Sequence, residues 1–115
     1  MGSDTWYWTA ERVAALRRVI ETAVVREGDK FYIVGSMGLR RYITENAARL
    51  GFDVPAWQIP NGMALLVYFG VLAKSQVGRR SASYRRRYDP NRRISREAIA
   101  HYRQLTRQQR IDGWP

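Results

Sequence analysis

The fold is decided by residues 59–72, which read IPNGMALLVYFGVL. Apolar side chains recur there at the spacing of one helical face, at Ile59, Met63 and Leu66. This spacing predicts a helix from about Trp57 or Pro60 to Phe69. Pro60 fits only in the first turn of that helix, where backbone amides lack intrahelical partners. Gly70 ends the helix, and the apolar residues after it predict a turn into a strand.

Two further helices and a strand are expected before this stretch. Thr9 is the expected cap of a first helix that Gly28 stops, with an apolar stripe of Val13, Leu16, Ile20 and Val24. Residues 30–34 are β-branched and aromatic, which predicts a short strand. Ser36 is the expected cap of a second helix that Gly51 ends, with an apolar stripe of Leu39, Ile43, Ala47 and Leu50.

The chain after this stretch predicts a basic hairpin and a last helix. Strands are expected over residues 71–75 and 82–88, joined by the polar turn at residues 76–81. Ser95 is the expected cap of a helix that reaches about Arg110, with a thin apolar stripe of Ile99, Tyr102 and Leu105. The order of elements is therefore helix, strand, helix, helix, strand, turn, strand, helix.

The composition indicates one folded domain. The 115 residues are 45% hydrophobic, which is enough for a single core. There is no cysteine, which excludes disulfides, thiolate metal sites and thiol nucleophiles. The N-terminus lacks the pattern of a signal segment, and the longest apolar run, residues 62–73, is shorter than the roughly 20 residues of a membrane-spanning helix. These features predict a cytoplasmic protein, associated with the nucleoid if its source is bacterial, archaeal or viral.

Positive charge is concentrated in the last third of the chain. Residues 1–73 carry eight Lys/Arg and seven Asp/Glu, whereas residues 74–115 carry twelve and three. Such a one-sided excess predicts a polyanionic partner, and nucleic acid is the commonest. An anionic membrane or an acidic protein surface comes next.

The segment from Leu39 to Tyr88 resembles the winged helix-turn-helix superfamily of DNA-binding proteins. The likeness lies in the third helix and its closing glycine, and in three further matches: Leu50-Gly51 ending the second helix, Gly78 at the wing and Tyr84 where an aromatic residue closes the sheet. The turn before the third helix departs from the common pattern, because it is longer and holds Pro55, Trp57 and Pro60.

This resemblance implies an α+β fold with a three-helix core, a β-hairpin wing and an added C-terminal helix. Residues 1–90 would form the winged-helix domain, and residues 91–115 a basic helix packed on that domain or extending it. It also implies that the third helix enters the major groove while the wing tracks the DNA backbone.

The DNA-binding residues implied by this reading come from three elements. Gln58 and Asn61, at the front of the third helix, are candidate base readers, because an amide can pair with adenine at two points. Arg40 and Arg41, near the start of the second helix, are candidate phosphate contacts. The wing and its two strands supply the remaining candidates: Lys74, Arg79, Arg80, Ser81, Arg85 and Arg87. Strand alternation puts Arg85 and Arg87 on the face opposite Tyr84, Arg86 and Tyr88.

Several of these features have a second interpretation. Gln58 and Asn61 could serve only to turn the chain into the helix, and the wing could be a solvated basic hairpin. The tryptophans Trp6, Trp8 and Trp57 could stack on unpaired bases, although large aromatic residues at element ends more often pack in a core or at an interface. The C-terminal helix could form a homodimer interface or extend the phosphate-binding surface, and the N-terminal aromatic residues could also serve a homodimer.

No enzyme is expected. His101 is the only histidine, and with no cysteine and scattered carboxylates no catalytic dyad, metal site or cofactor site can be assembled. We therefore expect a double-stranded DNA-binding protein without a membrane partner, acting in transcription regulation or as a replication or recombination accessory factor. The alternatives are an RNA-binding or ribonucleoprotein subunit and a protein-interaction winged helix within a larger assembly.

Overall fold

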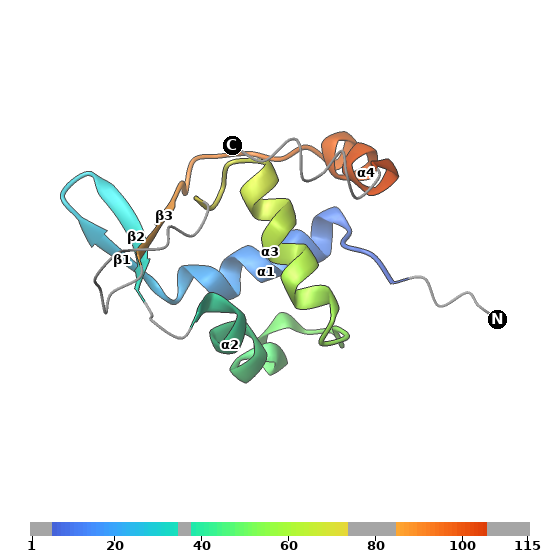
Figure 1. Ribbon diagram of the computed structural model, residues 1–115, viewed down its shortest axis with the longest axis horizontal. Coiled ribbons are helices and arrows are strands. Elements are labelled where there is room, and N and C mark those ends of the chain that lie inside the picture. Colours follow the sequence, from blue (N-terminus) through green and yellow to red (C-terminus); the bar gives the residue numbers. More distant parts are fainter. Residues whose placement is uncertain (1–5, 35–37, 74–84, 106–115) are drawn as a thin grey trace.

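The computed structural model describes residues 6–34, 38–73 and 85–105. Its elements are, in order, α1 (Ala10–Glu21), β1 (Val24–Glu27), β2 (Lys30–Val34), α2 (Gly38–Glu45), the 3-10 helix η1 (Ala47–Leu50), α3 (Gln58–Tyr68), β3 (Arg85–Tyr88) and α4 (Arg96–Gln104). Helices α1, α2 and α3 cross in the middle, with the sheet at one end of the molecule and α4 at the other (Figure 1). The described part of the chain is thus α+β, with four α-helices and a small antiparallel sheet, an arrangement compatible with a winged helix.

The sheet has the strand order β1-β2-β3. In the hairpin of β1 and β2, Glu27 pairs with Lys30, and β2 pairs with β3 so that Phe31 lies opposite Tyr88. The predicted strand at residues 30–34 is confirmed. The strand predicted at residues 71–75 is reduced, within the described residues, to one bridge between Leu72 and Tyr88. The predicted wing turn lies outside the described residues.

The first helix is shorter than predicted, because Val24 belongs to β1 and pairs with Ile33. The helix ends at Glu21 and is capped by Thr22, whose Oγ1 donates to the carbonyl of Val19 at 2.6 Å. Gly28 does not stop this helix but opens the two-residue turn of the hairpin, with a φ of 66°. A glycine with positive φ followed by a residue with negative φ is the pattern of a type II′ turn, which suits the twist of a hairpin.

The second helix is also interrupted. It ends at Glu45, and after Asn46 the chain continues as η1 rather than as one α-helix. The Asn46 Nδ2 donates to the carbonyl of Tyr42 at 2.8 Å. Such a bond from a side chain to the backbone gives the chain an alternative to continued helix. The predicted cap Ser36 lies outside the described residues.

Helix α3 begins at Gln58, between the two predicted starts. Pro60 is its third residue, where the missing N–H removes no intrahelical bond. The helix also approaches Trp8 very closely, since a Cβ added to Gly62 would meet the Trp8 ring at 2.6 Å. Glycine at this position therefore lets α3 lie directly against the indole.

One hydrophobic core joins all of these elements, with Leu16 and Ile20 from α1, Ile43 from α2, Leu66 from α3 and Ile33 from β2 among its residues. Helix α4 packs on the same core through Ile99 and Tyr102, both buried. The Tyr102 ring lies 5.0 Å from the ring of Tyr68. The C-terminal helix was a candidate homodimer interface, but its side chains Ile99 and Tyr102 are buried within their own chain. None of the helices in the described residues is long and apolar enough to cross a membrane.

Candidate nucleic-acid interface

Arg87 lies on the outward face of the sheet. It pairs in register with Tyr32, whereas its neighbour Arg86 pairs with the buried Ile33. Arg87 is exposed and Tyr88 is only 4% exposed, so the predicted alternation along this strand is confirmed for these residues. Arg85 begins β3 opposite Val34.

The charged side chain of Arg86 has a structural role. It is half-buried, and its Nη1 donates to the carbonyl of Ala73 across a long 3.5 Å. Burial lowers the pKa of Arg86, because a charged guanidinium loses hydration there. This side chain joins β3 to the segment that leaves α3.

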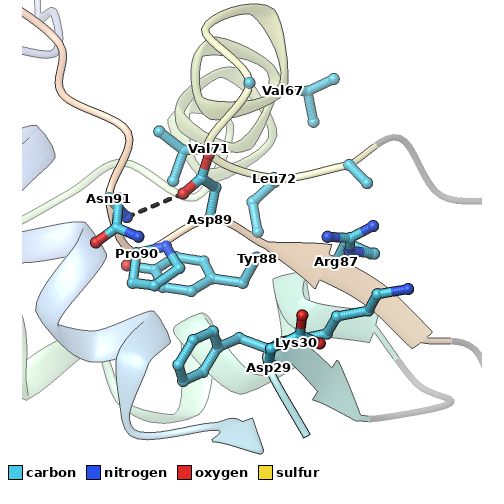
Figure 2. Close-up of a pocket in the computed structure, with 13 residues that line it drawn as sticks. Asp29, Lys30, Val67, Val71, Leu72, Arg87, Tyr88, Asp89, Pro90 and Asn91 are labelled. Carbon is cyan, nitrogen blue, oxygen red and sulfur yellow. Dashed lines mark hydrogen bonds between the residues drawn. The ribbon is translucent and has the colours of Figure 1, made fainter. Parts of the chain in front are cut away.

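Lys30 lies close to Arg87 at a cavity of about 560 Å³ between the hairpin, the end of α3 and β3. Figure 2 draws the two side chains at the same side of that cavity, which Leu72 also lines. Neither cation has a carboxylate partner among the described residues. Asp89 at the rim is already engaged, because it accepts the backbone N–H of Asn91 at 2.9 Å. Asp29 also lines the cavity, so the charge that can attract an anion is the local one of Lys30 and Arg87 on their shared side.

Lys30 was not among the residues expected from the sequence. One sequence feature near Lys30 was not used. The Gly28-Asp29 pair lies between two short runs rich in β-branched residues, which is a hairpin signature. The sequence already places Lys30 on the expected strand of residues 30–34, but its position beside the basic strand β3 depends on the pairing of β2 with β3, which no local pattern shows.

Arg40 and Arg41 are exposed near the start of α2. The Nε of Arg41 pairs with Oε2 of Glu45 at 3.0 Å, and both side chains are about 60% exposed. A pair this exposed contributes little free energy, so a phosphate can compete for Arg41. Arg40 has no carboxylate partner within the described part of the chain.

Gln58 points inward. It is 6% exposed, and its Nε2 donates to the carbonyl of Trp6 at 3.0 Å. Its Oε1 accepts from Nδ2 of Asn61 at 3.2 Å. Gln58 therefore ties the N-terminal segment to α3 and offers no edge to a base in this conformation. Asn61 is exposed on the same turn.

The three candidate tryptophans, Trp6, Trp8 and Trp57, differ in environment. Trp8 is buried at 4% exposure, and its Nε1 donates to the carbonyl of Gln58 at 3.0 Å. Trp6 is partly buried, with the guanidinium of Arg12 4.5 Å from its ring centre. Trp57 is 62% exposed at the start of α3. The structure therefore uses Trp8 in the core and leaves only Trp57 of the three largely in solvent.

The wing residues Lys74, Arg79, Arg80 and Ser81 lie outside the described residues, so their contacts stay predictions. His101 is exposed, and the described residues contain no cluster of three metal-ligating side chains. No family model, no curated protein and no solved structure matches this chain.

Proposed function

We propose that this protein binds double-stranded DNA, chiefly through the phosphate backbone, as a transcriptional regulator or a replication or recombination accessory factor. The observation that carries this proposal is the pair of cations Lys30 and Arg87 on β2 and β3, neither of which has a carboxylate partner among the described residues. Residues 85–93 add to it, with five arginines against one aspartate. Cations that neutralise phosphates release the counterions of DNA, which is a strong and sequence-independent driving force.

The proposed complex follows the arrangement of a winged helix. Arg85, Arg87 and Lys30 contact phosphates beside the groove together with the wing, while Arg40 and Arg41 contact the backbone from α2. Helix α3 has no charged residue, and its first turn offers Asn61 as its exposed polar side chain. Most of the affinity therefore comes from phosphate contacts, which carry no sequence information, and sequence preference is modest.

The test is a titration of a labelled duplex between about 50 and 200 mM salt, comparing wild type with two alanine variants. Arg87→Ala should weaken binding and reduce the salt slope by about one. Arg96→Ala removes the same charge, but Arg96 is ion-paired with Glu11 at the α4 end of the molecule. It should leave the slope unchanged. Equal losses in both variants would show that net charge alone attracts DNA, and this site would be wrong.

A protein-interaction role is favoured by one observation, the exposure of Trp57. An indole that is 62% exposed beside a helix without charges is typical of a protein interface. Trp57→Ala should not change duplex affinity if Trp57 serves a protein partner, and should weaken it if Trp57 lies on the DNA face. An RNA-binding role is the third candidate. Competition of the DNA duplex with structured RNA distinguishes it from DNA binding, because RNA helices present a different groove.

A further inference from the structure

A second cavity, of about 290 Å³, lies where the N-terminal segment, the first turns of α3 and α4 meet. Aromatic residues line it, including Tyr7 and Tyr102, together with the amide of Asn61 and the guanidinium of Arg103. Tyr7 is 44% exposed, so the cavity opens to solvent at an aromatic ring. Its volume is at the lower end for ligand pockets and suits one flat ring system.

A chain of hydrogen bonds determines which atom of Asn61 faces a ligand. The carbonyl of Trp6 can only accept, so the Gln58 amide turns its Nε2 toward it, at 3.0 Å. Gln58 Oε1 then accepts from Nδ2 of Asn61, at 3.2 Å. Asn61 Oδ1 is left without a hydrogen-bond partner among the described residues. The Asn61 amide therefore presents an acceptor, with one N–H beside it, to a ligand in the cavity.

The charge around the cavity excludes a cationic ligand. The guanidinium of Arg103 already lies 4.3 Å from the ring centre of Tyr7, where a second cation would bind and would be repelled. A neutral flat ring is not repelled, and it can stack on tyrosine and arginine planes alike. The acceptor of Asn61 adds a requirement for a hydrogen-bond donor at the edge of this ring.

We propose that this cavity receives an unpaired nucleobase with an exocyclic amino group, adenine or cytosine. Asn61 Oδ1 accepts from that amino group while its free N–H donates to the neighbouring ring nitrogen, and the base stacks on the face of Tyr7 opposite Arg103. This proposal rests on the proposed function, because DNA bound at Lys30 and Arg87 would supply the unpaired base. It assigns Asn61 to an unpaired base rather than to a paired base in the major groove.

The experiment measures binding of the full chain to a labelled duplex that is either fully paired or carries one central bulged A, C, G or T. Bulged A and C should bind about tenfold tighter than the paired duplex, with G and T in between. Tyr7→Ala should abolish the gain and Tyr7→Phe should keep it, since phenylalanine retains the ring. Asn61→Ala should make the four bases equivalent. Both side chains are exposed, so these variants are expected to fold.

Trp57→Ala is the matched aromatic control, because Trp57 is exposed but does not line the cavity. If this variant loses the gain while Tyr7→Ala retains it, the base stacks elsewhere and the proposal is overturned. Equal affinity for paired and bulged duplexes, with salt-dependent binding of both, also overturns it but leaves the proposed function standing.

A second arm of the experiment uses free AMP, CMP, GMP and UMP. Their binding is measured by tryptophan fluorescence, because Trp6 lines the cavity. Binding of AMP and CMP that requires Asn61, without any binding of duplex, would support the cavity and overturn the proposed function. Free nucleotides would then be its ligand rather than DNA. No binding of any oligonucleotide or nucleotide would overturn both.

Discussion

At the scale of single residues, the contact between Tyr88 and Glu21 links the basic strand to α1. The Tyr88 hydroxyl donates to Oε2 of Glu21 at 2.7 Å. Burial, and then this hydrogen bond, raises the pKa of Tyr88 to about 12. The unfolded value is about 10, so the folded state holds the phenol proton more tightly. The stabilisation from this contact is therefore complete below about pH 10 and is lost as the pH rises toward 12.

Tyr88→Phe should lower the free energy of unfolding by about 1 kcal/mol at pH 7, the usual contribution of one hydrogen bond. The difference from wild type should shrink in alkaline buffer, because the wild type alone must ionise a buried phenol. Urea unfolding at neutral pH and near pH 11 measures both effects. Tyr7→Phe, at an exposed tyrosine, is the control and should leave the alkaline loss in place. If the difference in the free energy of unfolding between wild type and Tyr88→Phe did not change with pH, the assigned hydrogen bond would be contradicted.

The amides at the front of α3 show what sequence can predict at this scale. The sequence places Gln58 and Asn61 on one helical turn and identifies both as polar readers. Their different environments depend on Trp6, 52 residues from Gln58 in sequence, whose carbonyl binds the Gln58 side chain. A contact between residues so distant leaves no periodic signal in the sequence.

At the scale of elements, the β1–β2 hairpin depends on Gly28. Its φ of 66° lies in the region that costs other residues about 1–2 kcal/mol. Gly28→Ala should lower stability by about that amount and increase hydrogen exchange at the Val25 amide, which lies in β1. Asp29→Ala is the matched control, because Asp29 has negative φ in the same turn. Equal effects of the two substitutions would show that the turn conformation does not limit this hairpin.

The elements differ in how well the sequence predicts them, for identifiable reasons. Helix α3 combines a clear apolar stripe with a proline in its first turn, so few alternatives exist. Val24 fits both the helical stripe of α1 and the alternation of β1, and its β-branched side chain favours the strand. At the break after α2, the side chain of Asn46 bonds back to the carbonyl of Tyr42, a contact that the apolar stripe around it conceals.

At the scale of the whole molecule, the sequence predicts the excess of charge but not which cations remain free. Arg41, Arg92 and Arg96 have carboxylate partners, whereas Lys30 and Arg87 have none among the described residues. Pairing depends on how the chain folds back on itself, as when Arg96 of α4 meets Glu11 of α1. The candidate phosphate site therefore follows from the tertiary structure more than from composition.

The two proposed sites are at opposite ends of α3, and this separation predicts that they act independently. Asn61 is in the first turn of the helix, and Arg87 shares a cavity with Val71 just beyond its last turn. The seven residues of helix from Asn61 to Tyr68 correspond to roughly 10 Å, and Val71 lies beyond them. Substitutions this far apart, without shared partners, usually have additive effects within about 0.5 kcal/mol.

Arg87→Ala should therefore reduce the salt slope and leave the preference for bulged adenine or cytosine intact, whereas Asn61→Ala should do the reverse. In the double variant, the loss of binding free energy should equal the sum of the two single losses within about 0.5 kcal/mol. Titrations of the four proteins with paired and bulged duplexes measure all of these quantities. A base preference that changes with Arg87, or a deviation from additivity above about 1 kcal/mol, would mean that the two residues contact one shared feature of the DNA.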